Sequence, residues 1–307
     1  APKRVAVVGA GPAGLAAAAT AAARGHEVTL IEAADEIGGQ FNMAKRIPGK
    51  EEFVETLRYF RRQLELHKVD VQLGTRVNAG ELARRRYDEV IVATGVKPRI
   101  PGIEGEDHPM VLSYVDVLRG NRPVGERVAV VGAGGIGFDV SEFLLHEEVP
   151  EHPDPDAVSV QEFFREWGVD TAYATRGAVD GVDPDRSKPA RRIVMTQRSK
   201  GKPGAGLGKT TGWIHRTTLK NHGVEMLSGV TYRHIDDRGL HIRIDDRNRL
   251  LEVDNVVLCT GQLSENGLYA ALSDAGQSVH LIGGAKLAAE LDAKRAIDEG
   301  TRVAAGL

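Results

Sequence analysis

The sequence predicts an α/β protein with two doubly wound parallel sheets, on three observations. Glycine-rich runs at residues 9–14 and 132–137 each follow a short apolar, β-branched segment, and each opens a helical segment. A segment that ends in Thr-Gly, residues 90–95, has an echo at residues 256–261. Strand and helix candidates alternate along most of the chain, which is typical of parallel sheets covered by helices.

The first third of the chain begins with a strand–helix–strand unit. Residues 5–8 predict a buried strand, residues 13–24 an alanine-rich helix, and residues 27–31 a second strand. Gly25 marks the end of the helix. The next elements are expected as a helix at residues 51–67, strands at 69–73 and 89–93, and an extended linker at 98–101.

The middle of the chain repeats this unit with an interruption. Residues 128–131 predict a strand and residues 138–145 continue a helix, but residues 147–156 are acidic and proline-bearing. The segment up to residue 189 is polar, with one helix at 160–167, so the next strand is displaced to 192–196. Later elements are expected as strands at 224–227, 240–244, 253–258 and 279–282 and a long helix at 288–305. This order predicts a first domain at residues 1–125 plus 252–307, with a second domain, residues 126–251, inserted into it.

The first glycine run matches the dinucleotide-binding pattern G-x-G-x-x-G in the context that gives the pattern a mechanism. Gly9 allows the tight turn, Gly11 lets a pyrophosphate approach the backbone, and Gly14 lets the helix pack on the strand. The phosphates then meet free N–H groups at the helix N-terminus. Glu32 follows the second strand, 18 residues after Gly14, near the place where a carboxylate binds ribose hydroxyls.

The second glycine run has the same spacing, but no acidic residue follows its second strand. The run Gln197-Arg198-Ser199-Lys200 stands there instead. Cations suit the 2′-phosphate of NADPH, which a carboxylate would repel, so Arg198 and Lys200 predict NADPH rather than NADH. A solvated charge run after a strand is the alternative. Two dinucleotide sites in one chain imply electron transfer between two carriers.

Three further groups of residues are possible sites, and none of them predicts an additional active site. The run from Gly204 to Thr210 resembles a phosphate-binding P-loop, but Pro203 stands where that motif needs glycine, so a loop near the second nucleotide is expected. The single cysteine, Cys259, excludes an internal disulfide and a four-cysteine cluster, and its apolar context predicts a buried thiol. The ten histidines show no metal-binding spacing, so no metal site is expected. His215 has either a ligand contact or a structural role.

Composition argues against nucleic-acid and membrane partners. The 307 residues carry a net charge of −3, which exerts no pull toward nucleic acid or an anionic membrane. The sequence has no run of about 18 apolar residues that would span a membrane. The basic start superficially resembles a secretory signal, but glycines and Pro12 interrupt its apolar segment. We therefore expect a cytoplasmic protein, and the start without Met suggests a processed end or a piece of a longer chain.

Three further runs carry a family resemblance. Residues 39–45 with 47–53 (GQFNMAK and IPGKEEF), residues 208–219 (GKTTGWIHRTTL) and residues 290–297 (ELDAKRAI) resemble the bacterial NADPH-dependent 2,4-dienoyl-CoA reductases. The resemblance covers the whole chain, but only the C-terminal region of those enzymes. The related trimethylamine and histamine dehydrogenases share this architecture, and some of them carry ADP in the flavin position.

The resemblance implies two Rossmann-like domains of the glutathione-reductase type, the first for FAD and the second for NADPH. Residues expected at the FAD are Gly9, Gly11, Pro12, Ala13, Gly14, Glu32, Gly39, Gln40, Arg46, Val77, Ala93, Thr94, Gly95, Gly284 and Ala285. Residues expected at the NADPH are Gly132, Gly134, Gly135, Ile136, Gly137, Arg198 and Lys200. Hydride transfer needs nicotinamide C4 within roughly 3–3.5 Å of flavin N5 and no general acid or base, so no catalytic side chain is assigned.

The acceptor of the electrons lies outside this sequence in that family. The dienoyl-CoA reductases carry an N-terminal barrel with FMN and a cysteine-bound iron–sulfur cluster, neither of which this sequence contains. The expected partner is therefore an electron acceptor such as an FMN/iron–sulfur barrel domain.

Two alternatives remain to the dienoyl-CoA reductase interpretation. One is a stand-alone NADPH:acceptor reductase with a diffusible partner. The other is a non-catalytic module that binds ADP in place of FAD. The second alternative rests on Ala285-Lys286, which stand where the family commonly has an Asp near the ribityl chain.

Overall fold

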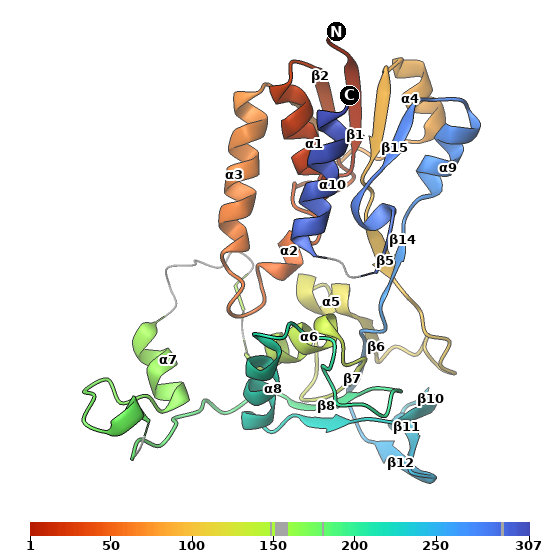
Figure 1. The fold of residues 1–307 in the computed structure, drawn as a ribbon. Helices are drawn as coiled ribbons and strands as arrows, with labels where there is room; N and C mark the ends of the chain where they lie inside the picture. The colour runs from red at the N-terminus through yellow and green to blue at the C-terminus, as the bar shows by residue number, and fades with distance from the viewer. Residues whose placement is uncertain (148, 151–158, 180, 290–291) are drawn as a thin grey trace. The chain divides into compact units, whose positions relative to one another are not determined.

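The computed structural model describes residues 1–147, 149–150, 159–179, 181–289 and 292–307. These residues form two compact units (Figure 1). Unit 1 comprises Ala1–Lys45, Glu52–Arg99 and Gln262–Leu307, and unit 2 comprises Arg46–Glu51 and Ile100–Gly261. Each unit holds a five-stranded sheet, which confirms the predicted α/β class.

The sheet of unit 1 has the strand order β15-β4-β1-β2-β3, and all neighbours are parallel. Its strands are β1 (Arg4–Val8), β2 (Glu27–Ile31), β3 (Asp70–Gln72), β4 (Glu89–Val92) and β15 (Val279–Leu281). Its helices are α1 (Pro12–Ala23), α2 (Phe41–Ala44), α3 (Phe53–Leu66), α4 (Ala79–Arg85), α9 (Gly267–Asp274), α10 (Ala293–Ala305) and the 3₁₀ turn η3 (Gly283–Ala285). A separate antiparallel pair joins β5 (Val96–Pro98) to β14 (Gln262–Ser264).

Helices cover both faces of this sheet, so its central strand is apolar at every inner position. Val5 and Val7 of β1 pack in a core with α1, α3 and α10. Ala6 and Val8 face the other way, into a core with α4 and α9. The two long helices α1 and α10 lie very close, because a Cβ on Gly300 would be 2.2 Å from the carbonyl oxygen of Ala13.

The sheet of unit 2 has the order β6-β13-β7-β8-β9, again with parallel neighbours. Its strands are β6 (Val111–Ser113), β7 (Arg127–Val131), β8 (Arg192–Thr196), β9 (Glu225–Leu227) and β13 (Asn255–Leu258), and its helices are α5 (Tyr114–Arg119), α6 (Gly135–Leu145) and α8 (Gly212–Asn221). Helix α7 (Val160–Trp167) and the 3₁₀ turn η2 (Arg176–Ala178) belong to the long insertion before β8.

A three-stranded antiparallel meander covers one face of this second sheet. It consists of β10 (Thr231–Asp236), β11 (Gly239–Ile244) and β12 (Arg247–Leu251). Ile235, Leu240 and Ile242 of the meander pack in one core with Ala129 and Val131 of β7. The strand before each glycine run has the same sequence in both units, Arg-Val-Ala-Val-Val, and the same buried pattern.

Several boundaries differ from those expected. Residues 100–125 and 252–261, expected in the first domain, lie in unit 2, because β6 and β13 pair within the second sheet. Each sheet therefore has its own strand that ends before a Thr-Gly pair, β4 in unit 1 and β13 in unit 2. The helix expected at 288–305 begins at Ala293 behind an Asp292 cap. Of the interruption at 147–156, residues 148 and 151–156 lie outside the described residues.

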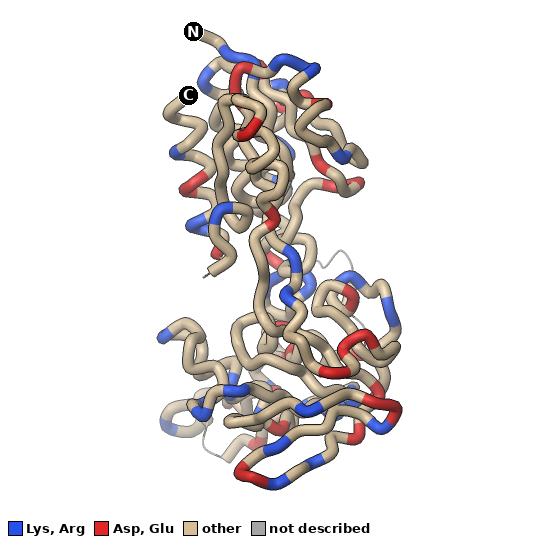
Figure 2. The backbone as a smooth tube through the Cα atoms, turned by 90° about the vertical axis from the view of Figure 1, so that its right-hand side faces the viewer, with Lys and Arg blue, Asp and Glu red and all other residues tan. Residues whose placement is uncertain are grey.

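Charged residues of both signs alternate along the chain in both units (Figure 2). Among the described residues, no helix combines the length and apolar character that crossing a membrane requires.

Candidate functional site

The first candidate site surrounds the N-terminus of α1 in unit 1. Gly9 has a φ of +107°, and a Cβ there would lie 2.4 Å from the carbonyl oxygen of Ala93. A Cβ on Gly14 would lie 1.8 Å from the carbonyl oxygen of Gly9, so the helix packs directly on the turn. By contrast, a Cβ on Gly11 would meet no atom within 4 Å. Two of the three glycines therefore shape the turn, and the third leaves open space above it.

The N-terminus of α1 has unpaired hydrogen-bond donors that suit an anion. Gly11 is the N-cap and offers no side chain, Pro12 follows at the first position, and the first turn carries no acidic residue. The free N–H groups and the positive end of a helix favour a phosphate. This backbone cradle fits the pyrophosphate of a dinucleotide.

Two further glycine segments border the same helix start. The N–H of Gly38 donates to the carbonyl oxygen of Ala10 (2.8 Å), and a Cβ on Gly39 would lie 3.0 Å from the Cα of Gly11. On the other side, a Cβ on Gly283 would lie 2.8 Å from the Cβ of Ala13. The structure thus gathers most of the expected residues here, namely Gly9, Gly11, Pro12, Ala13, Gly14, Gly39, Gln40, Gly284 and Ala285.

Glu32 stands at the carboxyl end of β2, beside the glycine turn. Its carboxylate accepts hydrogen bonds from the backbone N–H groups of Ala10 (2.6 Å) and Ala34 (2.8 Å). A carboxylate has roughly four acceptor positions, so two remain for ribose hydroxyls. Val77 lies nearby and half-buried, in the segment whose Thr75 N–H donates to the Glu32 carbonyl oxygen.

The remaining expected residues divide between the units. Ala93, Thr94 and Gly95 follow β4 in unit 1, and the Thr94 hydroxyl donates to the carbonyl oxygen of Glu265. Arg46, expected at the flavin side of the first site, lies in unit 2. Its guanidinium donates to the carbonyl oxygens of Leu118 (2.6 Å) and Val149 (3.1 Å). Arg46 therefore holds main-chain atoms of unit 2 together, and its contact with a bound flavin stays a prediction.

Asn42 is a residue of the first site that sequence reasoning missed. Its side-chain amide donates to the carbonyl oxygen of Ile37 (3.0 Å), but its buried Oδ1 accepts no hydrogen bond from any described residue. A Cβ on Gly38 would lie only 2.6 Å from that oxygen, so glycine at this position leaves room for it. A buried acceptor without a donor costs free energy, which a bound hydroxyl or amide would recover. Asn42 falls within the run that carries the family resemblance, the one signal that pointed to it.

The second candidate site repeats this cradle at α6 in unit 2. Gly132 has a φ of +119°, with a Cβ position 2.2 Å from the carbonyl oxygen of Cys259, and a Cβ on Gly137 would lie 1.9 Å from the carbonyl oxygen of Gly132. A Cβ on Gly134 or Gly135 would meet no atom within 4 Å. Gly134 is the N-cap, so no side chain caps the start of α6. Ile136 follows in the first turn. The backbone here fits a second pyrophosphate for the same reasons.

The hydrogen bonds around the two glycine turns correspond one to one. The N–H of Gly9 donates to the last residue of β2 (2.8 Å), and that of Gly132 to the last residue of β8 (2.9 Å). The N–H of Gly38 reaches the carbonyl oxygen of Ala10 (2.8 Å), as the N–H of Gly204 reaches that of Ala133 (3.1 Å). The loop that resembled a P-loop therefore lies against the second glycine turn, as expected.

Cationic side chains follow β8 in the second unit. Arg198 and Lys200 are exposed, and Gln197 fastens the loop by donating to the carbonyl oxygens of Ser199 (3.1 Å) and Gly201 (2.6 Å). Both basic residues follow the carboxyl end of β8, the strand that pairs with β7 before the glycine turn. An anionic group bound beside that turn would meet positive charge here.

Two titratable groups lie below the second site. Burial raises the pKa of the Cys259 thiol, so this cysteine is protonated and unreactive. Burial also raises the pKa of Glu142, which contacts the imidazole of His215 (3.1 Å) between α6 and α8. His215 therefore has at least a structural role, as a partner of a buried carboxyl group.

A comparison with known protein families identifies the chain's relatives. The model described as pyridine nucleotide-disulphide oxidoreductase matches residues 3–287. A metal reductase of Desulforamulus reducens is 28% identical over 288 residues, which cover 92% of this chain and 41% of that protein. An N,N-dimethylglycine/sarcosine dehydrogenase of Chromohalobacter salexigens is 31% identical over 287 residues, covering 89% and 35% respectively.

Solved structures share the fold. A 2-naphthoyl-CoA reductase complex superposes with a TM-score of 0.82 at 24% identity, over 100% of this chain and 40% of that chain. A thioredoxin reductase of T. acidophilum superposes with a TM-score of 0.66 at 15% identity, over 99% and 98%. The chain thus spans 41% and 35% of the length of these two sequence relatives, and nearly all of the thioredoxin reductase.

Proposed function

The chain belongs to the pyridine nucleotide-disulphide oxidoreductase family, and from that premise we propose that it oxidises NADPH with a bound FAD and passes the electrons to a separate acceptor. Family membership supports a flavin- and NAD(P)-dependent oxidoreductase module. The choice of NADPH, the placement of each cofactor and the acceptor are our proposal.

One observation carries the proposal, namely the duplicated anion cradle. Each unit presents a glycine turn with an open Cβ position, at Gly11 and at Gly134, in front of a helix start without a side-chain cap. A single such turn would suit one nucleotide. Two such turns in one chain provide binding sites for the two redox carriers that an NADPH:flavin reductase needs.

In this proposal unit 1 holds FAD and unit 2 holds NADPH. Glu32 orients the adenosine of the FAD by accepting from its ribose, and the α1 N–H groups bind its pyrophosphate. Arg198 and Lys200 bind the 2′-phosphate of the NADPH. Bound FAD supplies the hydride-accepting centre, so the protein's task is to orient the carriers and exclude water.

The acceptor is proposed from the resemblance to 2,4-dienoyl-CoA reductases. The chain spans 41% and 35% of the length of the two sequence relatives described above, so the rest of such proteins offers room for an acceptor domain. We propose an FMN/iron–sulfur barrel as that acceptor and an unsaturated acyl-CoA as the final substrate. A stand-alone reductase with a diffusible acceptor is the alternative within the same chemistry.

A second candidate function, an ADP-binding module without redox chemistry, is favoured by one observation at η3. Ala285 is fully buried and offers no acceptor for the ribityl hydroxyls of FAD. The neighbouring Gly284 carbonyl oxygen already accepts from the Ser264 hydroxyl (2.8 Å). This arrangement leaves adenosine binding at Glu32 intact and weakens only the flavin end.

Spectroscopy of the purified chain distinguishes these functions. The protein is denatured to release its nucleotide for chromatography, and a second sample is loaded with FAD and titrated anaerobically with NADPH. Bound FAD whose visible band bleaches with NADPH supports the reductase. Bound ADP, with FAD failing to bind even when added, supports the second candidate. A chain that binds neither nucleotide contradicts both.

A Gly134→Ala variant serves as a matched control. It should keep the flavin band, because unit 1 is unchanged, and lose bleaching by NADPH. Bleaching at the unaltered rate would show that the second glycine turn does not hold the hydride donor.

A further inference from the structure

The hairpin of β10 and β11 in unit 2 brings two histidines and one aspartate together. His234 and His241 are directly opposite partners in the antiparallel pairing. Asp236 lies two residues after His234, so both side chains point to the same face of β10. The register alone therefore places all three on one face of the meander, opposite the buried residues Ile235 and Leu240.

A bulge creates this arrangement. The pairing register shifts between Tyr232 and His234, so that Arg233 is the extra residue on β10. Without the shift, Arg233 would stand opposite His241, and His234 would stand opposite the buried Leu240. Bulges of this kind re-aim side chains and are over-represented near functional sites.

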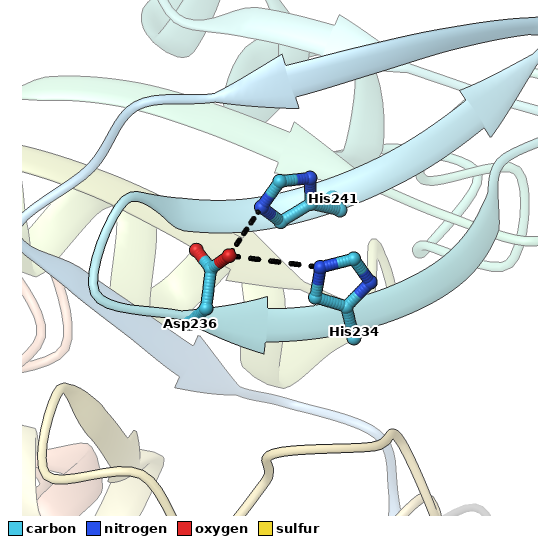
Figure 3. A group of neighbouring side chains, drawn as sticks. All are labelled: His234, Asp236 and His241. Carbon is cyan, nitrogen blue, oxygen red and sulfur yellow. Dashed lines mark hydrogen bonds and ion pairs between the residues drawn. The ribbon is translucent and has the colours of Figure 1, made fainter.

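The side chains converge on one carboxylate oxygen (Figure 3). Asp236 Oδ2 lies 2.9 Å from His241 Nε2 and 3.6 Å from His234 Nε2. The other oxygen, Oδ1, accepts from the backbone N–H of Arg238 (2.9 Å), which fixes the carboxylate at the hairpin turn. One potential ligand atom from each residue lies within 4.8 Å of the other two.

We propose that His234, Asp236 and His241 form a binding site for a divalent transition-metal cation such as Zn²⁺, Co²⁺ or Ni²⁺. Two imidazoles and one carboxylate are a typical donor set for these ions, with a fourth position left to water. Ligand atoms around a tetrahedral Zn²⁺ are about 3.3 Å apart, given bonds of roughly 2.0–2.1 Å. The two distances to Asp236 Oδ2 bracket that spacing.

The site needs only small side-chain rotations to close around an ion. The imidazole rings are stacked with centroids 4.0 Å apart, so they must tilt for both Nε2 atoms to face one ion. The His234 and His241 side chains are 42% and 23% exposed, which leaves them room to turn. The strand pairing holds the backbone of the three residues in place meanwhile.

Nearby arginines set the expected strength of binding. Arg233, Arg238 and Arg249 line the same shallow pocket of about 410 Å³, and their charges oppose a cation. Arg249 is paired with Glu225 (2.7 Å), which offsets one of them. The expected affinity is therefore weaker than that of a dedicated structural zinc site.

Without a metal, the Asp236 carboxylate and the His241 imidazole are joined by a hydrogen bond (2.9 Å). Hydrogen bonding to the Arg238 N–H and to His241 lowers the pKa of Asp236, which keeps its carboxylate charged. A deprotonated carboxylate is the form that can bind a metal ion.

Equilibrium dialysis of the untagged full chain against Zn²⁺ or Co²⁺ alone tests the site, with visible absorption reporting on bound Co²⁺. One ion per chain at pH 7.5 is expected. His234→Ala, His241→Ala and Asp236→Asn should each weaken binding at least tenfold. Asp237→Asn, at an exposed neighbouring carboxylate outside the cluster, should leave binding unchanged.

Circular dichroism shows whether each variant folds, and the wild-type chain decides the question if one does not. The wild-type chain should bind one ion at pH 7.5 and lose it when a chelator is added. No binding by the wild-type chain, or equal binding by the three cluster variants and Asp237→Asn, overturns the proposal. Neither metal binding nor circular dichroism depends on the redox activity. A failure of the metal-site proposal therefore leaves the proposed function unaffected.

Discussion

Glu32 and Gln197 occupy equivalent positions in the two sheets. Each is the first residue after the strand next to the glycine turn, and each donates its backbone N–H, 2.9 Å in both cases, to the last residue of the next strand. The backbones match, but a carboxylate stands in unit 1 and an amide with two following cations in unit 2. This difference predicts different adenosine ribose groups in the two sites.

The first prediction concerns cofactor choice. Arg198→Ala and Lys200→Ala should each weaken binding of NADPH about tenfold and leave NADH unaffected, because only NADPH carries the 2′-phosphate that the cations would bind. The measurement is the rate of flavin bleaching against the concentration of each nucleotide. Lys220→Ala, an exposed lysine at the end of α8, is the control. Equal bleaching of the wild-type chain by NADH and NADPH would refute the assignment.

The second prediction separates the roles of two glycines in the first turn. Gly11→Ala should lower stability by less than about 1 kcal/mol, because its φ of −76° suits any residue and its Cβ meets open space. The same methyl group occupies the cradle, so the variant should lose nucleotide affinity. Gly14→Ala should cost about 3 kcal/mol or more, because its Cβ would overlap the Gly9 carbonyl oxygen.

Chemical denaturation of the nucleotide-free variants measures this contrast. Nucleotide binding is then followed on the folded Gly11→Ala protein. A Gly11→Ala variant that keeps wild-type affinity would show that the cradle of α1 does not hold the pyrophosphate.

The third prediction concerns Glu89, the first residue of β4, which forms hydrogen bonds with residues at or near the amino-terminal ends of β1 and β15. Its carboxylate accepts from Lys3 (2.7 Å), Ser278 (2.5 Å) and His280 (3.1 Å). Burial alone would raise its pKa, but these hydrogen bonds outweigh burial and lower it to about 2. Because the folded pKa is below the unfolded value of about 4.3, the stabilisation is present above pH 4.3 and is lost toward pH 2.

Glu89→Gln should therefore lower the free energy of unfolding by about 1–2 kcal/mol at pH 7. Denaturation curves between pH 7 and pH 2.5 should show the difference from wild type shrinking below about pH 4.3. A difference that stays constant over this range would contradict the assigned pKa.

The fourth prediction concerns the only cysteine. Cys259 is buried and its pKa is raised, so iodoacetamide should label it in the unfolded chain and not in the native one. Flavin reduction by NADPH should be unaffected by the reagent. The family's description names disulphide chemistry, but a single cysteine cannot form an internal disulfide. If iodoacetamide slowed flavin reduction, the thiol would take part in the reaction, which contradicts the prediction.

Strongly patterned elements were predictable from the sequence. The strand at 192–196 and the helix at 160–167 were placed at the bounds that β8 and α7 have, because apolar runs and helical spacing are local signals. The glycine turns were equally readable, since their spacing fixes a backbone shape. Helix α8 was missed, because the loop-like residues before it hide its start and few of its residues are buried.

Pairing between distant strands was not predictable. The strand β13 was assigned to the wrong domain, because a strand that ends in Thr-Gly fits beside either glycine turn. In the same way, nothing in the sequence shows that the Arg46 guanidinium reaches the carbonyl oxygens of Leu118 and Val149. The His234–His241 pair also escaped notice, since it depends on a cross-strand register and a bulge that no sequence spacing encodes.

The close packing of Gly300 on Ala13 has a consequence for biosynthesis. Helix α1 is synthesised before unit 2, yet α10, the helix that packs against it, is synthesised after unit 2. Helix α1 therefore remains partly uncovered while unit 2 is translated. Chaperones or early binding of an adenine nucleotide would protect it during that interval.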